Sequence, residues 1–465
     1  MKHLTRRIIF FGTLFIILYL FILFFSYVSD VTMFGLFQSE NKILLYIFDL
    51  WLILISLTYI FLFFWIKDKK ITNHQFKVVI LFTVVFSLIL IFAQPTSSID
   101  IFHNFYKVKS FSFYGLNPFA VSTTIDCQNS PSTYTCVNEQ MTYGPLWLLI
   151  SILPGFITSY TLVASIFLFK IFLAIVNFAL IFLVYKILEK IADSYKYFGT
   201  FLFAWNPLIL FETINNGHND IVMIFFLVLA VYFFIVEKKM LVLPMVVLSI
   251  LIKYITFIFF PIFYILLLRK YPSIKEKIYF TIKNVILVFG LLILFFLPFW
   301  NGFSIFKDII YFSQGFIWKF NISLVPVLIF SIILLFNTLI NIKFDSDMLL
   351  LFSKQLSILI YLFTITKLFL KKNISLIKTL VVFAVVFLIF SVKIHPWYFI
   401  WIGPLLILES KKNSYMIFVI LTAIFFAGYT LTFTYISMFL LLILPGIIIL
   451  RKYWVKDNNG KLNHA

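Results

Sequence analysis

The chain has 465 residues, of which 63% are hydrophobic and only 12% charged, and its formal net charge is +19. A soluble domain of this length could not hide so much apolar surface, because its exterior must stay wetted. The positive charge does not indicate nucleic-acid binding, because lysine and arginine gather in short clusters between apolar runs, as on the cytoplasmic side of membrane proteins. These features predict an all-α polytopic membrane protein with no nucleic-acid partner.

The first three apolar runs are each about as long as a bilayer core requires: residues 8–28, 43–66 and 77–94. The second run ends in a cationic cluster, Lys67–Lys70. Because short cationic loops mark the cytoplasmic side, the N-terminus is predicted inside and the polar stretch Pro95–Thr142 outside.

The later cationic loops lie near 186–196 and at Lys371 and Lys372. They determine on which side of the membrane each later loop is predicted to lie. To keep them cytoplasmic, the runs 144–158 and 322–341 must be re-entrant or interfacial helices. Further helices are predicted near 197–213, 219–236, 240–252, 254–268, 280–299, 349–370, 374–393, 397–409, 415–433 and 436–450. The sum is about 14 spans in the cell membrane with both termini cytoplasmic.

Ionisable residues at span ends or at membrane depth are costly and tend to be functional. Those predicted on the external side are Asp100, Asp126, Glu212, His218, Asp220, Lys253, Lys393 and His395. Asp100 follows the third span directly, where a carboxylate at the mouth of a cavity can act as general base toward a hydroxyl group. The alternative is a solvent-exposed aspartate at a helix end.

The predicted hairpin tip Asn215–Asp220 is a second candidate. Asn216, Asn219 and Asp220 are of the residue types that cap helix N-termini, where free amides favour an anion such as a lipid phosphate. His218 is suited to donate a proton or to hydrogen-bond a sugar hydroxyl. An ordinary capped turn explains the same residues.

Two further external junctions carry cations. Lys253 stands between two short apolar helices, and the stretch from Lys393 to Tyr398 adds Lys393, His395, Trp397 and Tyr398. Phosphate requires cations and sugars stack on aromatic faces, although snorkelling and interfacial aromatics account for each residue alone. The sequence has no metal-ligand spacing and no Gly-rich phosphate loop, so neither a metal nor a nucleotide cofactor is expected. Cys127 and Cys136 in the external loop are either a disulfide or two free thiols.

With these residues the chain resembles the GT-C superfamily of membrane glycosyltransferases, and within it the polyprenyl-phosphomannose-dependent alpha-mannosyltransferases of bacteria and archaea. The resemblance covers about residues 95–410. Its most specific elements are Trp205-Asn206-Pro207-Leu208 followed by Asn216-Gly217-His218-Asn219-Asp220, and Tyr143-Gly144-Pro145-Leu146-Trp147. Asp100 with Tyr106, Gly115-Leu116-Asn117-Pro118-Phe119, Asp126, Glu212, Lys253-Tyr254 and His395-Pro396-Trp397-Tyr398 also carry it.

The resemblance implies an inverting transfer of a hexose, with mannose favoured, from a polyprenyl-phosphate-linked donor to a glycan or glycolipid acceptor on the extracytoplasmic face. Asp100 takes the position of the catalytic base. The substrate-binding candidates are Tyr106, Asp126, Tyr143, Glu212, Asn216, His218, Asn219, Asp220, Lys253, Lys393, His395, Trp397 and Tyr398. A transporter or flippase of lipid-linked sugars and a non-catalytic envelope assembly protein are the alternatives.

The predicted organisation has four parts. They are three N-terminal transmembrane helices (1–94), an external catalytic loop (95–143), a transmembrane GT-C core (144–450) and a cytoplasmic tail (451–465).

Overall fold

A computed structural model describes residues 2–28, 42–119, 141–159, 161–302, 375–390 and 395–429, with isolated positions between 352 and 366. Throughout these residues the secondary structure is helical, as predicted. The predicted helices near 322–341 and 436–450 lie outside the described residues, as does the tail 451–465.

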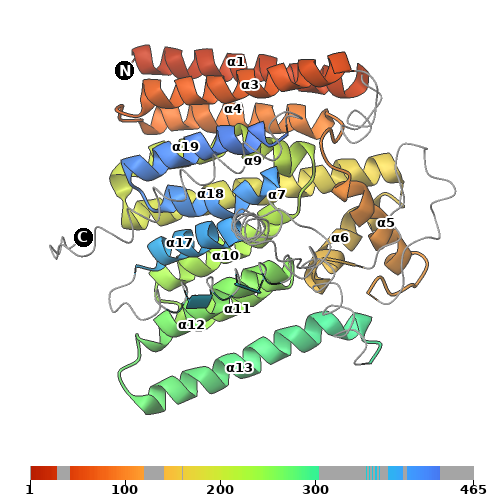
Figure 1. The fold of residues 1–465 in the computed structure, drawn as a ribbon, viewed down its shortest axis with the longest axis vertical. Helices are drawn as coiled ribbons and strands as arrows, with labels where there is room; N and C mark the ends of the chain where they lie inside the picture. Colours follow the sequence, from red (N-terminus) through yellow and green to blue (C-terminus); the bar gives the residue numbers. More distant parts are fainter. Residues whose placement is uncertain are drawn as a thin grey trace, which may run out of the picture.

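Three long helices lie side by side along one flank of the molecule (Figure 1): α1 (Lys2–Val28), α3 (Lys42–Ile66) and α4 (Asn73–Phe92). They match the first three predicted spans. Trp51 of α3 donates its indole N–H to the Leu18 carbonyl of α1 over 2.8 Å. Tyr59 of α3 donates to the Leu202 carbonyl over 2.6 Å, so this flank is fastened to the rest of the bundle.

The centre of the bundle contains α7 (Leu162–Ile191), the short η2 (Asp193–Tyr195), α8 (Lys196–Ala204), α9 (Pro207–Leu210), the π-helix η3 (Phe211–Asn215) and α10 (Asp220–Ile235). Asn206 caps α9 by accepting from the Ile209 amide over 2.9 Å, and Pro207 takes the first helical position. Proline is favoured there because its missing N–H has no partner in any case. Between Pro207–Asn215 and Asp220–Ile235 the helix axis bends by 120°.

The remaining helices pack around this centre. They are α5 (Asp100–Ser112), α6 (Pro145–Ile157), α11 (Lys239–Ile250), η4 (Tyr254–Phe259), α12 (Phe260–Leu268), α13 (Ile274–Phe296), η5 (Leu297–Phe299), α17 (Leu376–Phe390), η6 (Pro396–Tyr398), α18 (Phe399–Leu408) and α19 (Lys412–Ala427). Figure 1 shows α5 and α6 at the end of the bundle opposite the N-terminus.

Within the described residues, five helices are long and apolar enough to cross a membrane, or six if the bent pair is one span. They are α1, α3, α4, α7 and α13 with η5, and the bent pair adds residues 207–235. Several predicted spans, such as 240–252 and 397–409, are helices of 10–17 residues. The chain is therefore a membrane protein, and the count of about 14 spans stays a prediction.

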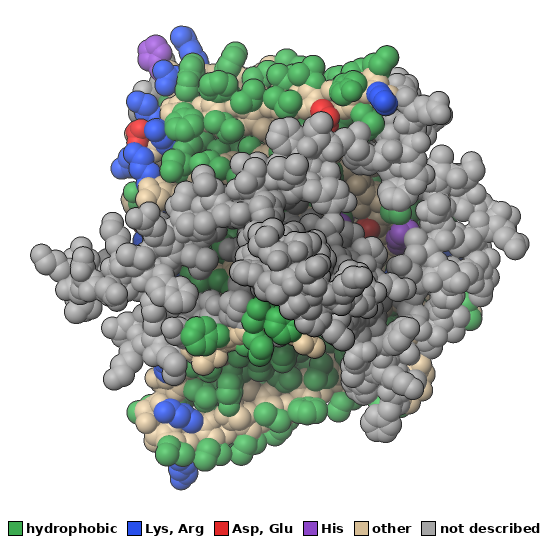
Figure 2. All heavy atoms as spheres, viewed as in Figure 1, with side chains coloured by type: hydrophobic (Ala, Val, Ile, Leu, Met, Phe, Trp, Pro, Cys, Tyr) green, Lys and Arg blue, Asp and Glu red, His purple; other side chains and the backbone are tan. Residues whose placement is uncertain are grey.

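Cationic loops distant in sequence meet at one end of the bundle. Lys412, at the start of α19, binds Asp68, in the loop after α3, over 2.7 Å. The Arg7 guanidinium lies 4.8 Å from the centre of the Trp65 ring, which joins the beginning of α1 to the same end. In Figure 2 lysine and arginine side chains gather along the left edge, away from α5 and α6.

Candidate active site

The carboxylate of Asp100 stands at the first residue of α5 and is partly open. Its side chain is 28% exposed, whereas those of Glu212 and Asp220 are fully buried. Tyr143 donates its hydroxyl to Asp100 Oδ2 over 3.1 Å, and His218 Nδ1 lies 3.6 Å from the same oxygen. Of these three carboxylates, only Asp100 is therefore accessible to a substrate.

His218 connects Asp100 to the buried interior. Its Nε2 atom lies 3.3 Å from Glu212 Oε2. Its ring stacks on Trp397 at 4.2 Å, and His395 stacks on Trp397 at 4.1 Å. Two nearly parallel rings at these distances must occupy opposite faces of the indole, so both faces of Trp397 are covered.

Glu212 lies in the π-helix η3 and has no exposed surface. Asn216 donates to its Oε2 over 3.0 Å, and Tyr429 donates to its Oε1. Single π-turns occur often at functional sites. Here the turn places Glu212 between His218 and Tyr429.

The buried Asp220 begins α10 and is paired with Lys253. Lys253 Nζ lies 2.7 Å from Asp220 Oδ2, and the Trp401 indole donates to Oδ1. The same ammonium lies 5.0 Å from the centre of the Tyr143 ring, within the range of a cation–π contact. Lys253 therefore joins Asp220 to the ring that hydrogen-bonds Asp100.

Gly144 explains how Tyr143 reaches this position. Its amide donates to the Ile252 carbonyl over 2.9 Å, and the Leu146 amide donates to the Leu251 carbonyl over 3.1 Å. A Cβ atom at position 144 would lie 2.0 Å from the Leu251 carbonyl oxygen. Only glycine permits this approach, which places Tyr143 beside Lys253.

We expect Gly144→Ala to destabilise the protein by about 1–3 kcal/mol or more, because the added methyl forces two backbones apart. Thermal unfolding of the purified protein in detergent measures the loss. Gly290→Ala in α13 is the matched control, since a Cβ atom there meets nothing within 4 Å. Equal unfolding midpoints for the two variants would contradict the packing described above.

The charges around Asp100 act on it in opposite directions. Burial favours the neutral acid and would raise the pKa of Asp100, but His218, Lys253 and His103 outweigh it and hold that pKa below its ordinary value. Burial raises the pKa of Tyr143 well above its ordinary value, and the Asp100 charge raises it further. At neutral pH a protonated Tyr143 thus donates to an ionised Asp100.

The other predicted site residues are placed as follows. Tyr398 stacks on Trp401 at 4.0 Å. Asn219 is buried directly before α10, and its Nδ2 atom has no hydrogen-bond partner among the described residues. Tyr106 lies on α5, its ring edge-on to Phe105. Asp126 and Lys393 lie outside the described residues, as do Cys127 and Cys136.

Two residues of this cluster, Trp401 and Tyr429, were not among the predicted site residues, and Asn215 was predicted only as the first residue of the hairpin tip. Trp401 stands one helical turn after Trp397, and this spacing places both side chains on one face of a helix. That spacing is the sequence signal for Trp401. Nothing in the sequence singles out Tyr429. Within the described part of the chain, no three His, Cys, Asp or Glu side chains are grouped to hold a metal ion.

The family model for the alpha-(1->6)-mannopyranosyltransferase N-terminal domain matches residues 24–269, more than half of the chain. The chain belongs to this family. It is therefore a membrane glycosyltransferase, as the resemblance implied, and more closely a mannosyltransferase. No curated protein matches the chain. The matched range begins in α1, includes α3 and α4, and ends after Lys253, so it contains most of the cluster around Asp100.

Proposed function

We propose that this mannosyltransferase moves mannose from a polyprenyl-phosphate-linked donor to a glycan or lipid-linked acceptor on the extracytoplasmic face of the cell membrane. The reaction inverts the anomeric carbon and forms the alpha-(1->6) linkage that the family description names. The enzyme is a multi-pass protein with Asp100 on the external side. The observation that carries this proposal is a partly open, ionised Asp100 beside His218 and Lys253.

Asp100 removes the proton of the acceptor hydroxyl as that oxygen attacks the anomeric carbon. The carbon–oxygen bond to the donor phosphate breaks on the opposite face, and the proton ends on Asp100. Negative charge then accumulates on the departing phosphate, where Lys253 and His395 stabilise it more strongly than in the ground state. Lys393, also cationic, is a further candidate for this role.

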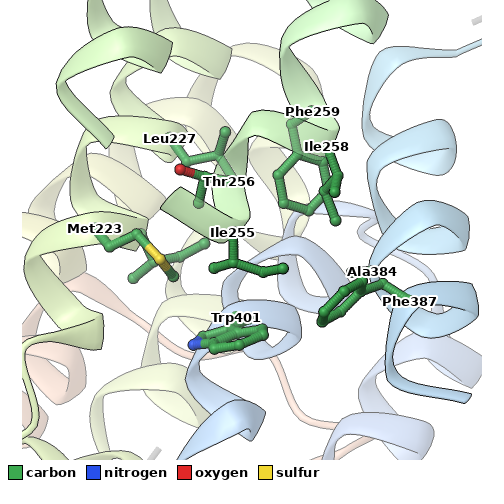
Figure 3. Close-up of a pocket in the computed structure, with 10 residues that line it drawn as sticks. Met223, Leu227, Ile255, Thr256, Ile258, Phe259, Ala384, Phe387 and Trp401 are labelled. Atoms are coloured by element: carbon green, nitrogen blue, oxygen red, sulfur yellow. The ribbon is translucent and has the colours of Figure 1, made fainter. Parts of the chain in front are cut away.

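A small apolar pocket lies beside the ion pair of Lys253 and Asp220. Met223, Leu227, Ile255, Phe259, Phe387 and Trp401 line it (Figure 3), from α10, η4, α17 and α18. Trp401 forms one wall and at the same time donates to Asp220, the partner of Lys253. Trp401 thus joins apolar surface to the cation that we assign to the donor phosphate.

The test is single-turnover transfer in proteoliposomes from radiolabelled beta-linked polyprenyl-phosphomannose to an alpha-mannoside-terminated glycolipid. Matched reactions contain polyprenyl-phosphoglucose, polyprenyl-phosphoarabinose or a nucleotide-linked mannose. We expect an alpha-linked mannosyl product from the lipid-linked mannose alone. Transfer only from the nucleotide donor would overturn the proposal, and labelled lipid that crosses the bilayer without transfer would favour a transporter.

His218→Gln is expected to move the acid limb of the pH–rate profile to higher pH. His218 is the largest of the contributions that lower the pKa of Asp100, so its removal lets burial raise that pKa. Lys253, His103 and Tyr143 remain and still lower the pKa of Asp100. Because the base must be ionised, activity then falls on acidification at a higher pH than in the wild type. Transfer rates from about pH 3 to about pH 8 measure the shift, because an ordinary aspartate titrates at about pH 4. The exposed His74→Gln is the control, and superimposable profiles would contradict the expected shift.

A further inference from the structure

The segment from Ala93 to Ile99, which joins α4 to Asp100, is fastened to the end of the π-helix. Asn215 donates from Nδ2 to the Gln94 carbonyl over 2.9 Å. Its Oδ1 accepts from the Thr96 hydroxyl over 2.7 Å. One asparagine side chain therefore holds this segment at two residues.

Asn216 continues the contact. Its Oδ1 accepts from the amides of Thr96 over 3.3 Å and Ser97 over 3.1 Å. Its Nδ2 donates to Ser97 Oγ over 2.6 Å and to Glu212 Oε2 over 3.0 Å. An asparagine side chain offers two donor hydrogens and two acceptor sites, so all four are in use. No group of Asn216 is left for a sugar hydroxyl.

Both asparagines are fully buried. Buried amides are costly unless hydrogen-bonded, and here each side-chain atom has a partner. Lys170 adds a further attachment by donating to the Ala93 carbonyl at the end of α4. Gly217 follows directly with φ +74°, and a Cβ atom there would lie 2.4 Å from Ile101 Cδ1. The chain after Asn216 thus turns against the first turn of α5, which bears Asp100.

We propose that Asn215 and Asn216 are positioning residues that hold the carboxylate of Asp100 in place. The inference rests on the proposed role of Asp100 as the base. Only Ser98 and Ile99 separate the last clamped residue, Ser97, from Asp100. Displacing a reacting group by 1 Å can lower a rate by about 100-fold. The hydrogen bonds from Asn215 and Asn216 to residues 94–97, which we call the clamp, therefore act on turnover through Asp100 without touching substrate.

The experiment compares Asn215→Ala and Asn216→Ala with Asn284→Ala, a buried asparagine of α13 that donates to the Phe280 carbonyl within its own helix. We expect kcat to fall about 10- to 100-fold in the first two variants while the donor KM changes less than about twofold. The control should keep its kcat. In hydrogen-exchange mass spectrometry, a peptide containing residues 94–100 should exchange faster in Asn216→Ala only, because Oδ1 no longer holds the Thr96 and Ser97 amides.

The Ser97→Ala variant completes a double-mutant cycle with Asn216→Ala. If both act through the same clamp, the double variant loses less than the product of the two single losses. Losses of kcat that multiply independently in the double variant would overturn the proposal. Unchanged hydrogen exchange of residues 94–100 in Asn216→Ala would overturn it too. So would a fall in kcat that only follows the fraction of folded protein. If wild-type enzyme fails to use the lipid donor, the proposed function fails, and the exchange experiment still decides whether the clamp exists.

Discussion

Asp100→Asn should lower the single-turnover rate of mannosyl transfer about 10²- to 10⁴-fold, the usual contribution of a general base. Asparagine has nearly the shape of aspartate and still accepts a hydrogen bond from Tyr143, but it cannot take up the acceptor proton. The assay is transfer from radiolabelled polyprenyl-phosphomannose in proteoliposomes. Donor binding should change little, because the lost interaction belongs to the transition state.

Asp68→Asn is the matched control for this substitution. Asp68 binds Lys412 at the opposite end of the bundle, and its side chain is 59% exposed. Exposed pairs of this kind contribute little to stability, so neither transfer nor the unfolding midpoint should change appreciably. Near-normal transfer by Asp100→Asn in folded protein would remove Asp100 from the role of base.

Lys253→Met is expected to lower both stability and transfer. Asp220 is then left in the interior without its cation, and breaking a buried pair in this way costs about 3–5 kcal/mol. The phosphate of the donor also loses its proposed partner. Unfolding midpoints in detergent and transfer rates measure the two effects on the same preparations.

The double variant Lys253→Met with Asp220→Asn separates these effects. Neutralising Asp220 removes the unpaired charge, so the unfolding midpoint should recover toward that of the wild type. Transfer should stay low, because the Lys253 ammonium no longer faces the phosphate. Wild-type transfer by the stable double variant would show that Lys253 serves only its ion pair.

The sequence alone determined the membrane class, the helical fold and the motif residues of the site. Apolar run length and the position of cationic loops are local properties, which is why α1, α3 and α4 match their predicted ranges closely. The family motifs likewise singled out Asp100, Lys253 and residues 216–220 before any contact was known. The re-entrant character of 144–158 stays a prediction from sidedness, and α6 is a short apolar helix there.

Tertiary structure decided which of these residues meet. Lys253 pairs with Asp220 across 33 positions, and Tyr429 reaches Glu212 across 217. In helices that are apolar all round, such as α10, the pattern does not distinguish a face turned to lipid from one turned to protein. Partners such as Trp401 and the close approach of Gly144 to Leu251 therefore depend on how whole helices pack, which local hydropathy does not encode.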